Sequence, residues 1–363
     1  NLSLQLEAYL TGTVTPIETK PLDIVLVLDV SGSMDDGFGT SGYEYVPVDD
    51  TEWSYNDIVY SPESYYYQVG ENEYRQVYGS ADRDRNSRYW VYSNYRIGYY
   101  QNRSFTQISD TSEDDPDAVI YTGTLYTRTY VEADTKLEAM QEAVNGFIDS
   151  VAASNGDHRI SIVKFAGNNS DSIGNDTYSS GWYRYNYSQI VRSWTDVTAD
   201  NAVTLKAAVN QLRGGGATRA DYGLSHAQDL LSDKDEARDS ARQVVILFTD
   251  GDPTSGSSFE EDVAAAAVNT ACDMKQDGVT IYTVGIFNGA DPNNDPDNRR
   301  TSDSNKYMHA VSSNYPGATA TGTWQGHEYD DWDDLVFGDR AENSNYYLAA
   351  DSADALKDIF ESI

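Results

Sequence analysis

Short apolar runs alternate with amphipathic segments along most of the chain. The apolar runs are rich in β-branched residues, as are parallel strands that are buried on both faces, and they lie at 24–28, 158–167, 244–248 and 278–287. The amphipathic segments repeat apolar residues at helical spacing, and they lie at 135–153, 199–212, 218–232, 259–276 and 352–363. This alternation predicts an α/β fold, in which helices flank a doubly wound and mostly parallel sheet.

One long interval, 35–134, interrupts the alternation. It holds seventeen of the chain's 29 tyrosines, in short stretches such as YYYQV, YRQVY, YWVYS and YRIGYY. The segments GENE, GSADRDRNS and SN between them are typical of turns, so we predict an antiparallel β meander inserted into the main domain. Its tyrosines either build the apolar face of a thin sheet or form a binding surface. For a binding surface the candidates are Tyr66, Tyr67, Trp90, Tyr92, Tyr99 and Tyr100.

The remaining segments complete the predicted organisation. Residues 1–20 alternate apolar and polar side chains, which predicts an edge strand or the tail of a preceding β module. Residues 21–34 and 135–363 then form the main domain. Within it, 315–343 reads as a loose loop, and 288–305 is an acidic loop that either holds Ca²⁺ or is solvated.

Polar oxygens follow the first apolar run directly. Asp29, Ser31 and Ser33 stand where a buried strand ends, and burying such groups is costly unless something binds them. Two further segments offer similar groups. Thr218 follows a Gly-rich turn at the start of a helix, and Asp250 follows the run at 244–248. Because strand ends and helix starts meet at one edge of such a sheet, these oxygens predict a site for a hard divalent cation.

The three segments together resemble the metal-ion-dependent adhesion site of the von Willebrand factor A family. The resemblance covers about 20–34 and 135–363, and this part of the chain is similar to the A domain of Gram-positive pilus-tip adhesins. It implies that Asp29, Ser31, Ser33, Thr218 and Asp250 surround one Mg²⁺ or Mn²⁺. It also implies that the Ser31 and Ser33 hydroxyls bind the ion directly and that the Thr218 hydroxyl joins them in the ligand-competent state. The two carboxylates would act mostly through water, and an acidic group of a partner would complete the coordination.

The composition narrows the class of partner. The net charge is −34, from 59 acidic and 25 basic residues, which argues against nucleic acid and anionic membranes as partners. No apolar run approaches the roughly 20 residues of a membrane span, so we expect no membrane insertion. Cys272 is the single cysteine, so the chain contains no internal disulfide. A chain that starts at Asn1 and lacks disulfides suits a mature extracellular fragment from the surface of a Gram-positive bacterium, attached to a pilus or the cell wall through regions outside this sequence.

The sequence supports one leading hypothesis for the function and two alternatives. The leading hypothesis is a metal-dependent adhesin that binds host matrix protein or mucin through a partner carboxylate. Since 35–134, 168–187 and 288–305 all leave carboxyl ends of strands, we expect the metal at the floor of a cleft walled by the Tyr-rich sheet and acidic loops. The alternatives are a carbohydrate-binding surface on the insertion, with the metal domain as scaffold, and a structural surface component. An enzyme is not expected, because GGGATR lacks the Lys-Ser/Thr of a nucleotide loop.

Overall fold

A computed structural model describes the chain at 20–84, 91–154, 156–169, 172–238, 240–256, 258–342 and 344–363. The strand predicted within 1–20 therefore lies outside the described residues, apart from Lys20. The chain divides into two compact units. We call Asn1–Gly39 together with Asp134–Ile363 the core unit, and Thr40–Ala133 the inserted unit.

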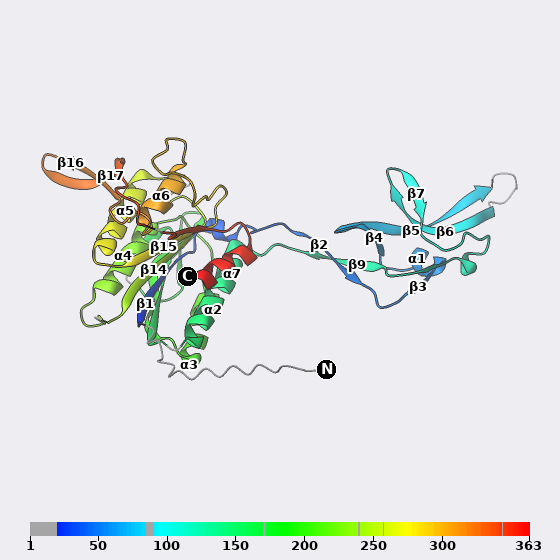
Figure 1. The fold of residues 1–363 in the computed structure, drawn as a ribbon, viewed down its shortest axis with the longest axis horizontal. Helices are drawn as coiled ribbons and strands as arrows, with labels where there is room; N and C mark the ends of the chain where they lie inside the picture. Colours follow the sequence, from blue (N-terminus) through cyan, green and yellow to red (C-terminus); the bar gives the residue numbers. More distant parts are fainter. Residues whose placement is uncertain are drawn as a thin grey trace, which may run out of the picture. The chain divides into compact units, whose positions relative to one another are not determined.

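The core unit is built on one sheet, which Figure 1 shows between two layers of helices. Its strand order is β11-β13-β10-β1-β14-β15-β18, and β12 pairs with β13. The strands from β10 to β18 run parallel, whereas β13 is antiparallel to β10. The bounds are β1 Leu22–Asp29, β10 His158–Phe165, β11 Asn168–Asn169, β12 Thr177–Ser180, β13 Tyr183–Asp196, β14 Arg242–Thr249, β15 Thr280–Gly285 and β18 Tyr347–Ala349.

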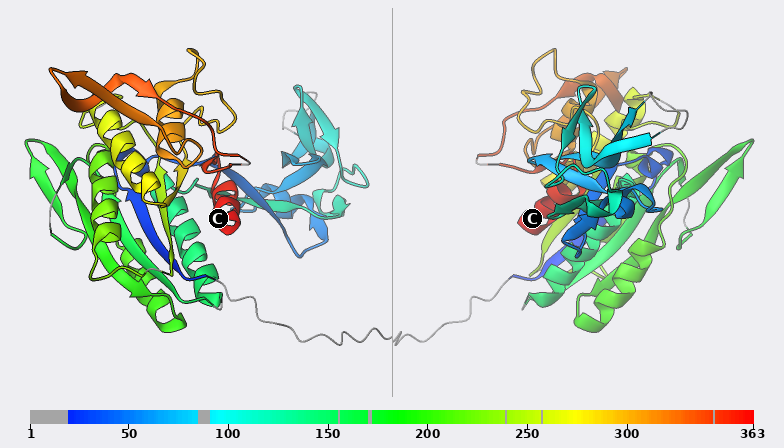
Figure 2. Two further views of the ribbon diagram at one scale, coloured as in Figure 1. Left: turned by 60° about the vertical axis from the view of Figure 1, so that its left-hand side comes forward. Right: turned by 90° about the vertical axis from the view of Figure 1, so that its right-hand side faces the viewer.

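Helices cover both faces of this sheet (Figure 2). On one face lie α2 Lys136–Ala153, α3 Ala199–Asn210 and α7 Ala353–Ser362; on the other lie α4 Ala220–Ser232, α5 Glu261–Gln276 and α6 Asp303–Val311. The central strand β1 explains the arrangement. Leu26 and Leu28 pack into the first layer, while Val25 and Val27 pack into the second. A strand buried on both sides needs an unbroken apolar run, which is what the sequence of β1 provides. The parallel strands and the helices on both faces confirm the predicted α/β class.

Helix α2 begins at a capping box. The Thr135 hydroxyl accepts a hydrogen bond from the Glu138 backbone N–H at 3.1 Å, and the Glu138 carboxylate accepts one from the Thr135 N–H at 2.9 Å. Two backbone donors that the helix itself cannot pair are thereby satisfied. The box fixes Lys136 as the first residue of the helix.

The expectation of a loose loop at 315–343 is wrong. Strands β16 (Thr319–Trp324) and β17 (His327–Val336) form a hairpin there. Gln325 and Gly326 make its two-residue turn, with φ of 52° and 80°, as tight hairpin turns require. The hairpin docks on α5, where Asn269 donates to the Ala320 carbonyl and accepts from its N–H, both at 2.8 Å. That pairing depends on tertiary contact and leaves no periodic signal in the sequence.

The inserted unit consists of antiparallel strands with one short helix. Its main sheet has the order β2-β9-β4-β5-β6-β7, and β3 pairs with β8. The bounds are β2 Gly42–Pro47, β3 Glu52–Ser54, α1 Tyr55–Val59, β4 Tyr66–Gly70, β5 Glu73–Asp84, β6 Val91–Gln101, β7 Ser104–Gln107, β8 Ile120–Thr122 and β9 Tyr126–Val131. The predicted Tyr-rich antiparallel insertion is thus present, but β9 returns to lie between β2 and β4, so the sheet is not a simple meander.

Two local features of the inserted unit differ from the sequence prediction. The segment SN does not make a turn, because β6 continues through it and Asn94 takes a φ of 53° beside a register shift against β5. Such a bulge bends a strand without ending it. The helix α1 was not predicted; its capping box joins Ser54 and Asp57. The core of the unit is small and consists of Trp53, Ile58, Val77, Ile97, Val119, Tyr121 and Leu125.

Candidate metal site

Three loops meet at the carboxyl edge of the core sheet. Strand β1 ends at Asp29, and the next residues are held by backbone hydrogen bonds to the loop before α4. The Gly32 N–H donates to the Gly216 carbonyl at 2.9 Å, and the Gly215 N–H donates to the Val30 carbonyl at 3.0 Å. Gly215 and Gly216 have φ of 149° and 101°, so the loop follows a path that side chains with a Cβ rarely adopt.

Four of the five predicted metal residues form one hydrogen-bonded group. The Ser33 hydroxyl donates to Asp250 Oδ1 at 2.8 Å, and the Ser31 and Ser33 hydroxyl oxygens are 3.1 Å apart. Asp29 Oδ1 accepts from the Ser31 N–H at 2.8 Å. Asp29, Ser31 and Asp250 are buried, and Ser33 is half-buried. The loop after β1 and the end of β14 therefore place their oxygens together.

Thr218, the fifth predicted residue, lies in the adjoining loop. It is buried, and its backbone pairs with Thr254 through hydrogen bonds of 2.8 and 2.9 Å. No hydrogen bond joins its hydroxyl to the other four described residues. Its loop is nevertheless fastened to theirs through Asn186 on β13, whose amide donates to the Val30 carbonyl at 3.1 Å and to the Gly215 carbonyl at 3.0 Å. In the sequence Asn186 stands out only as the first residue of an Asn-x-Ser sequon, which gives no indication that it joins these loops.

Two further residues complete the site, and sequence reasoning missed both. The Thr249 hydroxyl donates to Asp29 Oδ2 at 2.7 Å and so fixes the orientation of that carboxylate. Lys136 Nζ lies 2.7 Å from Asp250 Oδ2, and the side chains of both are largely withdrawn from solvent. Thr249 could have been found from the sequence, because it directly precedes Asp250. No local signal existed for Lys136, which is 107 positions from Asp29 and 114 positions from Asp250 in the sequence.

The electrostatics of the group favour a bound cation. Burial and the nearby Asp250 carboxylate raise the pKa of Asp29 to about 7, although hydrogen bonds from Ser31 and Thr249 act in the opposite direction. Two buried carboxylates thus face each other with Lys136 as their neighbouring positive charge. The available donors are carboxylate and hydroxyl oxygens, which are the ligands of hard divalent ions. Asp29, Ser31, Ser33 and Asp250 therefore fit such an ion, with Thr218 in the adjoining loop.

A polar groove begins beside this group. It has a volume of about 750 Å³ and is lined by Lys136, Phe38, the segment 286–293 and 349–351. Asp291 and Asp351 give it acidic walls. The groove contains part of the predicted acidic loop, and Lys136, which pairs with Asp250, also lines it. The Tyr-rich wall that we predicted for the cleft stays a prediction.

The six predicted ligand-surface residues differ in their exposure. Tyr66 is buried, and its ring contacts Tyr45, so it belongs to the interior of the inserted unit. Tyr67 and Tyr99 are half-buried and stack on each other with ring centroids 5.5 Å apart. Tyr92 and Tyr100 are about half exposed. Trp90 lies outside the described residues.

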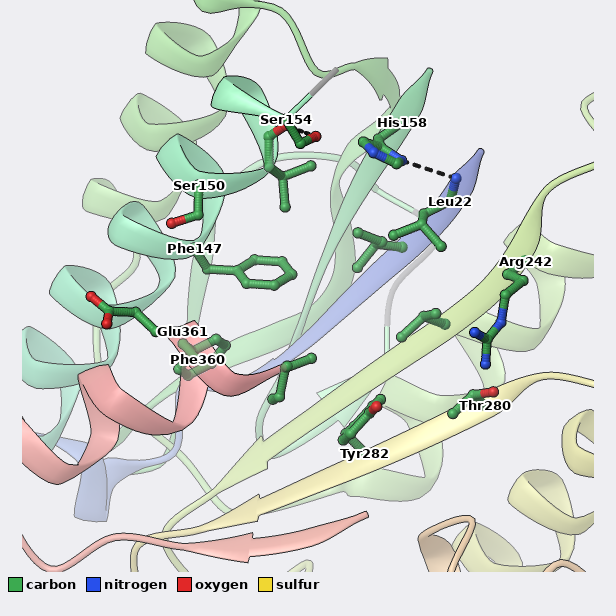
Figure 3. Close-up of a pocket in the computed structure, with 14 residues that line it drawn as sticks. Leu22, Phe147, Ser150, Ser154, His158, Arg242, Thr280, Tyr282, Phe360 and Glu361 are labelled. Atoms are coloured by element: carbon green, nitrogen blue, oxygen red, sulfur yellow. Dashed lines mark hydrogen bonds between the residues drawn. The ribbon is translucent and has the colours of Figure 1, made fainter. Parts of the chain in front are cut away.

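A second cavity lies at the opposite, amino edge of the core sheet (Figure 3). It measures about 290 Å³, and Phe147 of α2 and Phe360 of α7 face strand residues such as Ile24 and Val244. His158 Nδ1 accepts from the Leu22 N–H at 3.1 Å there, and burial lowers the pKa of this imidazole. The cavity is mainly apolar and offers no group of oxygen ligands. In open α/β sheets, ligand sites lie beyond the carboxyl ends of the strands, so the hydroxyl–carboxylate group is the better candidate.

Three further observations concern other metal sites and membrane spans. Among the described residues, no group of three or more His, Cys, Asp or Glu side chains is gathered to hold a metal. In the loop at 288–305, Asp291 and Asp295 each accept a hydrogen bond from the backbone N–H group two residues further along the chain. These bonds stabilise turns of the loop and do not test Ca²⁺ binding, which stays a prediction. No helix within the described segments is long and apolar enough to cross a membrane.

Comparison with known families identifies the fold. A model of the von Willebrand factor type A domain matches residues 132–315, which is about half of the chain. The chain therefore belongs to the von Willebrand factor type A family, as the sequence motifs predicted. Domains of this family commonly bind a divalent metal, and they are typically interaction domains. No curated protein matches the sequence.

Solved structures give more distant similarities. The pilus adhesin SpaC from Lactobacillus rhamnosus GG is 14% identical, with 95% of this chain and 30% of that chain covered and a TM-score of 0.40. Proximal thread matrix protein 1 from the mussel byssus is 16% identical, with 62% and 41% covered and a TM-score of 0.36. A von Willebrand factor type A protein from Catenulispora acidiphila is 16% identical, with 66% and 44% covered and a TM-score of 0.36. The chain thus spans less than half the length of each of these three, and similarity at this level says nothing about function.

Proposed function

We propose that this chain is the ligand-binding domain of an extracellular adhesin and that it captures a carboxylate of a host protein through one Mg²⁺ or Mn²⁺. The observation that carries the proposal is the hydrogen bond between Ser33 and Asp250, which draws two loops into one oxygen-rich group at the carboxyl edge of the sheet. Asp29, Ser31, Ser33, Thr218 and Asp250 would hold the ion. The protein does no chemistry on its ligand in this proposal.

The charge of the chain gives the metal its role. At −34 the protein repels an acidic partner, so a partner carboxylate needs a local positive centre. A bound divalent ion supplies that centre as an electrophile with a coordination position for an outside oxygen. The serine hydroxyls contribute neutral oxygens, and Lys136 offsets one of the two carboxylates. The group therefore adds little negative charge beyond what the ion itself neutralises.

The neighbouring groove suggests how a partner is selected. A peptide whose carboxylate reaches the metal residues would extend past Lys136 into the groove lined by Asp291 and Asp351. Those acidic walls favour a basic residue close to the captured carboxylate. The partner class is thus a matrix protein or mucin glycoprotein that presents an acidic and a basic side chain near each other. The setting would be the cell surface of a Gram-positive bacterium, with attachment to a pilus or the wall through regions outside this sequence.

The test is binding of the chain to immobilised collagen, fibronectin, laminin and mucin, first in Mg²⁺ and then in EDTA. We expect one of these proteins to bind in Mg²⁺, to be released by EDTA and to bind again when Mg²⁺ is restored. The double variant Ser31→Ala/Ser33→Ala should lose this binding. Ser193→Ala, at an exposed position of β13, is the matched control and should bind normally. Binding that is indifferent to EDTA would refute a metal-dependent adhesin and leave the metal residues a structural role.

A further inference from the structure

The inserted unit holds a pocket that none of the metal residues touches. Its volume is about 290 Å³. It lies where the short helix α1 rests against β5 and β6, and its lining consists of Tyr55, Asn56, Val59, Tyr60, Ala81, Tyr92, Tyr95 and Pro116. Every lining residue is uncharged, and four of them are tyrosines. In so acidic a chain, an uncharged aromatic pocket is a distinct chemical environment.

The pocket is built on close backbone packing. Gly79 of β5 lies directly under α1, because a Cβ at that position would come within 2.3 Å of Val59 and 2.6 Å of the Tyr55 ring. The glycine therefore lets the helix lie flat on the strand. Tyr55 and Tyr95 pack edge to face with ring centroids 5.1 Å apart and form one wall. This wall is fixed by packing, so the pocket is preformed.

The exposed tyrosines of the pocket are not explained by the core of the unit. Tyr60 is 78% exposed and Tyr92 is 49% exposed, and neither belongs to the buried cluster around Trp53 and Ile97. Large aromatic rings left in water at the rim of a preformed pocket contribute little to folding. They are, however, well suited to a ligand, since tyrosine offers a flat apolar face and a polar hydroxyl at low entropic cost.

The polar atoms around the pocket indicate the chemistry of the ligand. Burial raises the pKa of Tyr55, and the nearby Tyr95, Tyr60 and Tyr92 act in the same direction. The four tyrosines all line the pocket, so their hydroxyl groups lie around it. The Asn56 amide donates to the Asp117 carboxylate, which orients it at the edge of the pocket. Hydroxyls and an amide both donate and accept hydrogen bonds. Asp117 and its acidic neighbours Asp114 and Asp115 disfavour an anionic ligand.

We propose that this pocket binds one pyranose ring of a neutral saccharide, with the sugar face against an exposed tyrosine and the sugar hydroxyls bonded to Asn56 and tyrosine hydroxyls. The volume lies at the lower end of the range for small-molecule sites, about 300 to 1,000 Å³, and suits one ring rather than a long chain. A proline-rich peptide would instead need an extended aromatic groove. The site is independent of the metal and of the proposed adhesin mechanism.

The test uses the full chain and saturation-transfer NMR with methyl glycosides of galactose, glucose and mannose and with N-acetylglucosamine and N-acetylgalactosamine. Sialyllactose and a polyproline peptide serve as the anionic and peptide probes. We expect saturation transfer to at least one neutral sugar, unchanged in EDTA. Tyr60→Ala and Tyr92→Ala should each weaken its affinity about tenfold, the loss of one aromatic contact.

Tyr78→Ala is the matched control. Tyr78 alternates with Gly79 along β5 and so faces away from α1, and it is an exposed tyrosine that packs edge to face with Tyr100. This variant should leave sugar binding unchanged. Three results would overturn the proposal: no transfer to any neutral sugar, equal binding by Tyr60→Ala, or binding of the polyproline peptide alone. Sugar binding that persists when metal-dependent protein binding fails would refute the adhesin proposal alone, and the reverse result would refute this one alone.

Discussion

Lys136 Nζ lies 2.7 Å from Asp250 Oδ2, while the other oxygen of the same carboxylate accepts the Ser33 hydroxyl at 2.8 Å. Asp250 therefore links Lys136 to the group of oxygens that we propose as metal ligands. Lys136 is the first residue of α2 and follows the inserted unit by three positions. The lysine thus both compensates a buried charge and competes with a cation for it.

The first prediction follows from that double role. Lys136→Met should lower the free energy of unfolding in EDTA by about 3 kcal/mol, because it leaves a buried carboxylate without its partner. The same variant should bind Mn²⁺ about tenfold more tightly, since a positive charge next to the site is removed. Calorimetric unfolding in EDTA and isothermal titration with Mn²⁺ measure the two effects.

A matched control exists in the exposed pair of Lys206 with Asp149, which has an N···O distance of 2.6 Å. Lys206→Met should change stability by less than about 0.5 kcal/mol, as exposed ion pairs contribute little. If Lys136→Met instead binds Mn²⁺ more weakly than the native chain, the lysine acts by orienting Asp250 and not by competing with the ion.

The second prediction concerns the hydrogen bond from Thr249 to Asp29. Thr249→Val keeps the shape of the side chain and removes the donor, so Asp29 loses its orientation. We expect Mn²⁺ affinity to fall by about 10- to 100-fold, which is typical when a partner behind a metal ligand is lost. The control is Thr283→Val on the neighbouring strand β15, where the hydroxyl donates to the Met308 carbonyl at 3.1 Å. Equal affinities for the two variants would contradict the assigned role of Thr249.

The third prediction concerns the buried lysine of α5. Lys275 Nζ donates to the carbonyls of Ala310 at 2.6 Å and Tyr315 at 2.9 Å, and burial lowers its pKa to about 8. An unfolded lysine loses its proton near pH 10.4, so between these values the unfolded chain binds more protons than the native chain. Stability should therefore rise with pH from about 8 to 10, by up to about 3 kcal/mol.

Urea unfolding of the native chain and of Lys275→Met across this pH range measures the effect. The variant has no proton to lose at this position, so the rise assigned to Lys275 should be absent from it. A native chain whose stability falls in step with that of the variant would show that this lysine keeps its proton throughout the range.

The fourth prediction separates core from surface in the inserted unit. Tyr66 is buried against Tyr45, whereas Tyr100 is half exposed. Tyr66→Ala should destabilise this unit by about 3 kcal/mol or more through lost packing. Tyr100→Ala should change its stability by less than about 0.5 kcal/mol. Hydrogen exchange of the β4 and β6 amides reports on the unit itself, and similar protection in the two variants would contradict the division.

The parts of the fold that the sequence predicted share a physical cause. Strands buried on both faces require continuous apolar runs, and helices on a sheet require apolar stripes, so both leave patterns that can be recognised without a structure. The four-residue spacing of Asp29 and Ser33 is also local, since both lie on one loop. These features led to the family and to the α/β sheet.

The parts that could not be predicted depend on contacts between distant positions. The hairpin β16–β17 is held by Asn269 of α5, and Lys136 pairs with Asp250, which is 114 positions away in the sequence. Asp29 is fully buried at the end of β1, which lies between β10 and β14 in the sheet. Among the predicted surface tyrosines, Tyr66 is buried because alternate residues of a strand face opposite sides, and the sequence did not reveal which side is covered.

The most direct test of the central claim is isothermal titration of the metal-free full chain with MgCl₂ and MnCl₂. We predict one bound ion per chain, no binding by Asp29→Ala, and none by Ser31→Ala/Ser33→Ala. Circular dichroism of each variant in EDTA checks that it remains folded. A native chain that binds no ion, or folded variants that bind it as the native chain does, would show that this group of oxygens is not a metal site.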